Sequence, residues 1–323
     1  MPSLYPLRFQ PIFRRYLWGG RRLKTALSKQ IGDGNDYAES WEVVDHGQDQ
    51  SVVAVGTLAG TTLHELNRRY GRELFGDRDA PSSFPLLFKF LDANQQLSVQ
   101  VHPNDAQAAK QQPPDFGKTE AWFIVHADPG SLVYAGLQKG IDRETLQRQI
   151  EQGSTRNCMH QFQPRAGDCI FIPAGVVHAL GAGLVVAEIQ QSSDTTFRLF
   201  DWNRLGPNGK PRDLHVEQAL QVIDFDCGPV APRQPRPTEN ASKARLVECN
   251  YFTWDRWEFD GTQRMGGDNR SHILAVIRGL AFVEGDPLEQ PLDRGQTMLL
   301  PASLGTVAIR ATEPTIILDA YIP

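Results

Sequence analysis

Residues 97–105, Leu-Ser-Val-Gln-Val-His-Pro-Asn-Asp, alternate apolar and polar side chains and then stop at a proline. In a β-strand, successive side chains point to opposite faces, so Ser98, Gln100 and His102 would share one face. The leucine and the two valines would pack on the other. A glutamine and a histidine that point into one cavity are unusual core residues but suitable metal ligands. The stretch therefore predicts a strand whose Gln100 and His102 either form part of a metal site or are ordinary polar residues at the strand end.

The composition of the chain limits what such a site could serve. The 323 residues are enough for two domains, or one large one, with a substantial apolar core. The formal net charge is -5 and charged residues make up 22% of the chain, which argues against a surface that binds polyanions. We therefore expect no nucleic-acid partner.

The sequence also carries no pattern for export or membrane insertion. Residues 1–6 lack a basic region followed by an apolar core, and no window approaches the roughly 18 to 20 apolar residues of a membrane span. The cysteines are scattered, without C-x-x-C spacing, in a chain too large to depend on disulfides: Cys158, Cys169, Cys227 and Cys249. We expect a cytoplasmic protein with reduced thiols and no membrane partner. A monomer and a weak dimer are both compatible with the sequence.

Most of the chain predicts short β-strands separated by turns. Apolar runs bounded by Gly, Pro, Asn or Asp recur at 84–91, 97–101, 121–125, 169–172, 184–189, 272–277, 298–300 and 315–320. Helical spacing is confined to 62–70, 141–152 and 214–223, and Thr62 is suited to cap the first of these helices. This pattern favours a mainly β sandwich or jelly-roll barrel with a few short helices.

A proline-rich stretch divides the chain into two parts. Prolines at 229, 232, 235 and 237 fit neither a helix nor a central strand. On its two sides, residues 165–174 and 293–302 align at a constant offset of 128, each with a glycine turn, an apolar strand and Pro-Ala. The repeat predicts two tandem barrels, with a catalytic metal-binding domain at 1–228, a linker at 229–240 and a second domain at 241–323. Because His178 aligns with Thr306, we expect the second domain to have lost its metal.

Two more residues join Gln100 and His102 as candidate ligands. Glu120 begins an apolar strand, although a solvated edge residue is the alternative. His178 has apolar neighbours, and a lone histidine in that setting is more often a satisfied core residue. Together, N and O donors from different strands are what a first-row metal requires. Two imidazoles, an amide and one carboxylate leave a divalent ion with a charge of about +1, so it can stabilise an enediolate.

The motifs, in this order, resemble the type I mannose-6-phosphate isomerases, and more narrowly their short bacterial form, which lacks a large helical insertion. The likeness covers nearly the whole chain. It rests on Gln-x-His-Pro at 100–103, Lys-x-Glu at 118–120 and Pro-Ala-Gly-x-x-His at 173–178, together with segments at 16–20, 39–43 and 84–91. The resemblance implies two tandem cupin-type jelly-roll barrels, the second degenerate, and one Zn²⁺ per chain.

The resemblance also implies an enzyme that interconverts mannose 6-phosphate and fructose 6-phosphate, with a small phosphosugar as its partner. The family's zinc ligands map onto residues of matching type, namely Gln100, His102, Glu120 and His178. Residues 188–199 are similar to the family's second active-site segment, whose Glu, Asp and Arg map onto Glu188, Asp194 and Arg198. Lys118 matches the lysine beside the glutamate ligand.

Residue chemistry agrees with these assignments, because an aldose–ketose isomerisation needs a base, a stabiliser for the enediolate and help in opening the ring. In its apolar strand, Glu188 would have a raised pKa suited to moving a proton, with a salt bridge to Arg198 as the alternative. Arg198 suits an enediolate or a phosphate oxygen. Lys118 could bind phosphate or assist ring opening. Asp194 could orient Arg198 or act as the acid in ring opening.

The phosphate site is less sharply defined, because no glycine-rich phosphate cradle is present. The phosphate should therefore meet side chains. By family resemblance Ser98, on the same face as Gln100, is a candidate, with Arg198 or Lys118 nearby. The group that removes the C2 proton stays open at this level.

Other functions occur on cupin folds, and fold alone does not separate them. A metal-dependent dioxygenase requires iron and usually a more histidine-rich ligand set, so Gln100 argues against it. A non-catalytic sugar-phosphate-binding cupin needs no acid–base group, whereas this chain has Lys118, Glu188 and Arg198 together. An isomerase acting on a different phosphosugar stays open. The sequence does not distinguish zinc from manganese, cobalt or iron.

Overall fold

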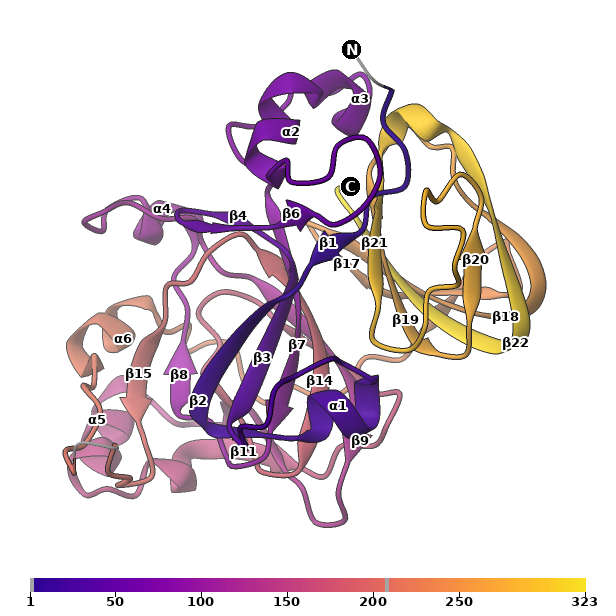
Figure 1. Cartoon of the computed structure of the whole chain (residues 1–323). Helices are drawn as coiled ribbons and strands as arrows, with labels where there is room; N and C mark the ends of the chain where they lie inside the picture. Colours follow the sequence, from indigo (N-terminus) through magenta and orange to yellow (C-terminus); the bar gives the residue numbers. More distant parts are fainter. Residues whose placement is uncertain (1–2, 207–208) are drawn as a thin grey trace.

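The computed structural model describes residues 3–206 and 209–323. Residues 1–2 and 207–208, which fall within the predicted first domain, lie outside the described ranges. The described chain is mainly β, with three larger sheets and only short helices (Figure 1). The prediction of a mainly β fold is confirmed.

The first large sheet, within the described residues, has six antiparallel strands in the spatial order β12-β9-β14-β7-β3-β2. Their bounds are β12 Cys169–Ile172, β9 Glu120–Ala127, β14 Leu184–Gln191, β7 Leu86–Ala93, β3 Tyr37–Val43 and β2 Ile12–Gly20. In this sheet Glu188 on β14 is paired with Lys89 on β7 and with Trp122 on β9. Three side chains from neighbouring strands therefore lie side by side on one face.

The second sheet has, in the described part of the chain, five antiparallel strands in the order β11-β10-β13-β8-β15. Their bounds are β11 Met159–Phe162, β10 Val133–Leu137, β13 His178–Leu180, β8 Val99–Val101 and β15 Phe197–Phe200. Apolar residues of the two sheets pack against each other, with Trp122 and Val186 from one and Val133 and Leu180 from the other. The two sheets therefore share one apolar core.

The third sheet lies in the C-terminal part, coloured orange to yellow in Figure 1. Its strands are β16 Arg236–Pro237, β17 Lys243–Glu248, β18 Thr253–Gly266, β19 His272–Arg278, β20 Ala281–Val283, β21 Thr297–Leu300 and β22 Thr306–Tyr321. One side of this sheet has its own apolar core, which includes Trp257 and Val276. The other side packs Trp254 and Ile273 into the core that also holds Phe123 and Ala187 of the six-stranded sheet.

Short elements cover the ends and outer faces. Two strand pairs lie near the N-terminus, formed by β1 Phe9–Gln10 with β6 Val52–Val53 and by β4 Asp45–His46 with β5 Asp49–Gln50. The helices are α1 Arg22–Leu27, α2 Leu63–Arg69, α3 Gly71–Phe75, α4 Asp105–Ala108, α5 Arg143–Glu151 and α6 Val216–Val222, with 3-10 turns at Thr155–Cys158 and Ala302–Leu304. Thr62 caps α2 through a reciprocal capping box with Glu65, as predicted. Among the described residues no helix has the length and apolar character needed to cross a membrane.

The internal repeat is visible in the strands. β12 and β21 begin at Cys169 and Thr297, and β13 and β22 begin at His178 and Thr306, each pair 128 residues apart. The glycine turn before each strand has a positive φ, +95° at Gly167 and +82° at Gly295, a conformation that glycine adopts without strain. The bounds of the two domains and their description as tandem barrels stay predictions.

Candidate metal and substrate site

A cavity of about 320 Å³ opens between the six-stranded and five-stranded sheets. Seven of the residues singled out in the sequence line it: Ser98, Gln100, Lys118, His178, Glu188, Asp194 and Arg198. His102 and Glu120 lie directly behind the lining, in contact with Lys118. The structure therefore brings every sequence-predicted site residue to one place.

The alternation along residues 97–102 sets this arrangement. Val99 and Val101 are buried in the core beneath α5 and α6, while Ser98 and Gln100 face the cavity. In the five-stranded sheet, Gln100 on β8 is paired directly with His178 on β13. Strand pairing thus places two candidate ligands from distant parts of the sequence side by side.

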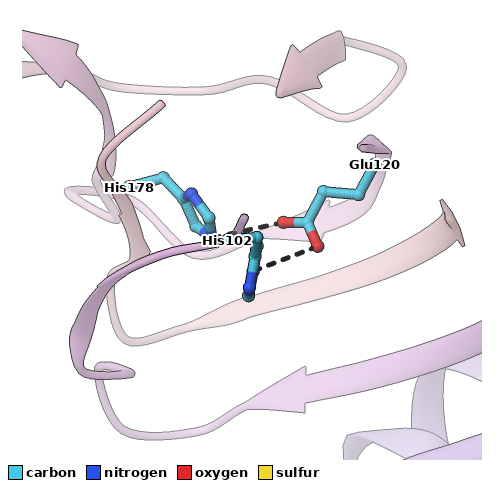
Figure 2. A group of neighbouring side chains, drawn as sticks. All are labelled: His102, Glu120 and His178. Carbon is cyan, nitrogen blue, oxygen red and sulfur yellow. Dashed lines mark ion pairs between the residues drawn. The ribbon is translucent and has the colours of Figure 1, made fainter. Parts of the chain in front are cut away.

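His102, Glu120 and His178 form a compact buried cluster (Figure 2). Their candidate ligand atoms all lie within 4.8 Å of one another. The two carboxylate oxygens of Glu120 face different rings: Oε2 lies 3.5 Å from His102 Nε2, and Oε1 lies 3.3 Å from His178 Nε2. All three side chains are almost fully buried.

The ring orientation of both histidines is fixed from behind. His102 Nδ1 donates to the carbonyl of Thr195 and His178 Nδ1 donates to the carbonyl of Val176, each at 2.8 Å. A carbonyl only accepts, so each neutral ring carries its proton on Nδ1 and a lone pair on Nε2. Burial lowers the pKa of His178 to about 4, and burial together with the Lys118 ammonium lowers the pKa of His102 well below its usual value. Both rings are therefore neutral at physiological pH.

Glu120 completes a donor set that fits a divalent cation. Burial and the nearby Glu188 carboxylate raise the pKa of Glu120 to about 7, against the opposing effect of Lys118. Among the described residues, Glu120 Oε1 has no hydrogen-bond partner although it is buried. Oε1 lies beside the lone pair of His178 Nε2 and is free to bind a cation, while the other oxygen, Oε2, already contacts the Lys118 ammonium. These residues fit a metal site.

Gln100 lies beside the cluster in a specific orientation. Its Nε2 is 3.3 Å from His178 Nε2, and its Oε1 accepts a hydrogen bond from Ser98 Oγ at 3.4 Å. The amide nitrogen therefore faces the cluster, and a half-turn of the amide would present the oxygen, which is the atom able to act as a ligand. Gln100 thus lies beside the cluster, with its amide turned away from the orientation of a ligand, and its role as a ligand stays a prediction.

Lys118 lies between the cluster and Glu188. Its Nζ lies 3.1 Å from His102 Nε2, contacts the Glu120 carboxylate and is 3.8 Å from Glu188 Oε1. It is buried, at 4% exposure, so these contacts are made in a medium of low polarity. The Lys118 ammonium group therefore lies next to the His102 Nε2 lone pair and the Glu120 carboxylate.

The environment of Glu188 differs from both sequence predictions. Its Oε1 pairs with Lys89 Nζ at 3.2 Å and its Oε2 accepts a hydrogen bond from Trp122 Nε1 at 2.9 Å, so Lys89 and not Arg198 is its partner. Burial alone would raise the pKa of Glu188, but the ammonium groups of Lys89 and Lys118 lower it below its usual value. The prediction of a raised pKa is wrong, because two buried cations outweigh desolvation.

Sequence reasoning missed Lys89 and its second partner, Glu39. Lys89 Nζ lies 3.8 Å from Glu39 Oε1, and Trp41 Nε1 donates to Glu39 Oε2 at 2.5 Å. The pKa of Lys89 is raised, because Glu188 and Glu39 outweigh the lowering effect of burial. A lysine in the middle of β7, a strand with every residue buried, was the available signal, since a buried charge requires a partner.

Arg198 lies on the lining of the same cavity. Its Nε donates to Ser98 Oγ at 3.3 Å and its Nη1 donates to the Asp213 carbonyl at 2.8 Å. Asp194 is exposed and also lines the cavity, but no ion pair or hydrogen bond joins it to Arg198 in the described part of the chain. The structure therefore does not support a role for Asp194 in orienting Arg198; Ser98 and Asp213 hold it.

Comparisons with known proteins identify the family of this chain. The chain matches the family models for the type I phosphomannose isomerase catalytic domain at residues 6–121 and for the mannose-6-phosphate isomerase cupin domain at residues 242–318. It is 35% identical over 305 residues to mannose-6-phosphate isomerase ManA of Bacillus subtilis, covering 93% of this chain and 94% of that protein.

Two further relatives extend the comparison. The chain is 33% identical to the mannose-6-phosphate isomerase of Streptococcus mutans, with 93% of each chain covered. The crystal structure of the mannose 6-phosphate isomerase from Bacillus subtilis matches with a TM-score of 0.89 at 30% identity, covering 98% of this chain and 99% of that one. The fold, the donor cluster and these matches together show that the chain belongs to the type I mannose-6-phosphate isomerases.

Proposed function

We propose that this chain is a metal-dependent isomerase that interconverts mannose 6-phosphate and fructose 6-phosphate through an enediolate. The observation that carries the proposal is the content of one cavity. A donor cluster that fits a divalent cation, a buried lysine–glutamate pair and an arginine with a neighbouring serine all meet there. These are the three parts that an aldose–ketose isomerisation of a phosphosugar needs.

The metal would be held by Gln100, His102, Glu120 and His178, and we propose one zinc ion per chain. Two neutral imidazoles and one carboxylate favour zinc among common divalent ions. When bound, the ion supplies Lewis acidity toward the oxygens of the sugar. The fixed tautomers of the two histidines direct both Nε2 lone pairs toward the carboxylate before any ion binds.

Glu188 and Lys118 are the groups that we assign to proton transfer between C1 and C2. The lowered pKa of Glu188 keeps it ionised at neutral pH, so it can accept a proton. Lys118 lies between Glu188 and the donor cluster, where an ammonium group can stabilise negative charge on an enediolate oxygen. Lys89, which lines the same cavity, supports this arrangement through its ion pair with Glu188.

Ser98 and Arg198 are our proposed phosphate ligands. They lie within hydrogen-bond distance of each other on the cavity lining, and Arg212 lines the same space. A guanidinium group and a hydroxyl together offer several donors to phosphate oxygens. Because the contacts of Lys118 are all with the cluster and Glu188, we place Lys118 with the acid–base groups. Asp194, exposed on the lining, remains the candidate acid for ring opening.

The direct test measures metal content and conversion of mannose 6-phosphate to fructose 6-phosphate before and after chelation, with glucose 6-phosphate and free mannose as comparison substrates. We expect one zinc per chain, loss of activity on chelation and recovery with added zinc. Metal-free protein that isomerises mannose 6-phosphate at the full rate would refute the mechanism. A clear preference for another phosphosugar would reassign the substrate.

We also propose a cytoplasmic location and a monomer or weak dimer in solution. Support for the location comes from the four cysteines, all of which are unpaired. Light scattering across a range of protein concentrations measures the oligomeric state, and fractionation of cells measures the location.

A further inference from the structure

Asp115 lies behind the donor cluster, in a second cavity of about 830 Å³. Its carboxylate accepts four hydrogen bonds. Oδ1 accepts from the Phe116 amide at 2.8 Å and lies 3.1 Å from His46 Nε2, while Oδ2 accepts from Ser193 Oγ at 2.9 Å and from Thr195 Oγ1 at 2.6 Å. Burial opposes ionisation, but the hydrogen bonds from His46 and Thr195 lower the pKa of Asp115 well below its usual value. The side chain is therefore a carboxylate with every lone-pair direction used.

Thr195 links Asp115 to the metal-binding cluster. Its hydroxyl donates to Asp115, its amide donates to Ser193 Oγ at 3.2 Å, and its carbonyl accepts the Nδ1 proton of His102 at 2.8 Å. The carbonyl is the group that sets the tautomer and the ring plane of His102. Its position depends on a loop whose side-chain anchor is Asp115.

We propose that Asp115 is a positioning residue that fixes the Thr195 carbonyl and, through it, the orientation of His102. This inference rests on the proposed metal-dependent function, because His102 acts there as a ligand. Partners behind a ligand of this kind orient the ring and change metal affinity without touching the ion.

The hydrogen bond between Asp115 and Thr195 also joins two segments that carry site residues. Asp115 stands three residues before Lys118 and five before Glu120, whereas Thr195 stands three residues before Arg198. The carboxylate thus ties the segment that carries Lys118 and Glu120 to the segment that carries Arg198. Both halves of the cavity wall are held in one geometry by this contact.

The test uses variants that remove the link at either end. Thr195→Val removes the hydroxyl but keeps the side-chain shape and the backbone carbonyl, Thr195→Ser keeps the hydroxyl, and Asp115→Ala removes the anchor. Asp45→Asn is the matched control. Asp45 is buried in the same second cavity, accepts from the Phe84 amide at 2.8 Å and lies 3.2 Å from His64 Nδ1, but its side chain contacts neither Thr195 nor His102.

Two quantities are measured on the full chain. The first is the dissociation constant for Zn²⁺, by competition with a chromophoric chelator. The second is the solvent-exchange rate of the His102 Nδ1 proton in metal-free protein, by NMR. We expect Thr195→Val and Asp115→Ala to weaken Zn²⁺ binding about 10- to 100-fold and to accelerate proton exchange. We expect Thr195→Ser and Asp45→Asn to match the parent protein in Zn²⁺ affinity and in the exchange rate of the His102 Nδ1 proton.

The outcomes separate this inference from the proposed function. Parent-like Zn²⁺ affinity and proton exchange in Thr195→Val would overturn the role of Asp115, and this variant decides the matter even if Asp115→Ala does not fold. A parent protein that binds no Zn²⁺ would refute the proposed metal dependence, while the exchange rate in Thr195→Val would still test the link from Asp115 to His102.

Discussion

Replacing Lys89 with methionine tests how the site keeps Glu188 ionised. Lys89 Nζ lies 3.2 Å from Glu188 Oε1, and at an effective dielectric constant of about 20 this contact contributes an attraction of about 5 kcal/mol. Lys118, at 3.8 Å, contributes about 4 kcal/mol by the same calculation. Lys89→Met therefore removes more than half of the attraction that opposes desolvation, and the pKa of Glu188 rises. A protonated Glu188 cannot accept a proton from the substrate.

We expect the acidic limb of the kcat profile to move to higher pH in Lys89→Met. The ratio of kcat at about pH 8.5 to kcat at about pH 6 should increase roughly tenfold or more, since a tenfold change needs only about 1.4 kcal/mol. Unfolding should also become easier by about 3–5 kcal/mol, the usual cost of breaking a buried pair. Steady-state kinetics across pH and urea denaturation measure the two effects.

Lys29→Met is the matched control for this prediction. Lys29 is equally buried and pairs with Glu42 at 2.5 Å, outside the substrate cavity. Its replacement should cost similar stability but leave the pH profile in place, and any general loss of metal in acid would occur in both variants. A Lys89→Met enzyme with the same pH profile as Lys29→Met would refute the reasoning about Glu188.

Three further predictions concern the metal site and the C-terminal part of the chain. Zn²⁺ affinity should begin to fall as the pH drops below about 7, where Glu120 takes up a proton in competition with the ion, and should fall further as the pH approaches about 4, the pKa of His178. Metal content after dialysis at each pH measures this, and a Zn²⁺ affinity that stays constant down to about pH 4 would contradict the ligand assignment. Gln100→Glu should bind Zn²⁺ more tightly but turn over more slowly, because an added negative charge weakens the Lewis acid, and unchanged kcat would argue that Gln100 is not a ligand. In the C-terminal part, Asp319 and Asp268 raise the pKa of His272 to about 10 despite its burial. The ion pairs of protonated His272 therefore stabilise the fold fully below about pH 6.5, and this stabilisation is lost as the pH rises through about 10. The urea concentration at the midpoint of unfolding should therefore fall over that pH range in the parent protein and much less in His272→Asn. An equal change with pH in both proteins would contradict the raised pKa of His272.

Local sequence patterns predicted the elements whose signal is short-range. The alternation at residues 97–102 placed Gln100 on the cavity face, and the capping pattern at Thr62 marked the start of α2. The 128-residue repeat predicted equivalent strands at 169–172 and 297–300, which the structure contains. For the strand and the helix the deciding information lies within a few residues, and for the repeat it lies in a direct alignment of two segments, so no knowledge of tertiary contacts is needed.

The missed features depend on long-range pairing. The pKa of Glu188 is lowered by Lys89, which is 99 residues away in the sequence and becomes its neighbour only through the register of β14 with β7. Asp115 gains its role in the same way, through contacts with Ser193 and Thr195. Periodicity predicts which face of a strand a residue occupies, but it does not identify the residue on the neighbouring strand. The sequence therefore predicted that Glu188 is buried but not that Lys89 neutralises its charge.

The pairing of Glu188 with Lys89 and Trp122 has a consequence for folding. A shift of β14 by one residue would turn Glu188 into the apolar core that holds Val185, Ala187 and Ile189, and would leave the charge of Lys89 without its partner. Unpaired buried charges are costly, so a misaligned sheet would be less stable than the native one by an amount that hydrophobic contacts alone would not impose. The side chains that we propose for proton transfer therefore also favour the correct register of this sheet, so a chain that forms the sheet stably has Glu188, Lys89 and Trp122 side by side.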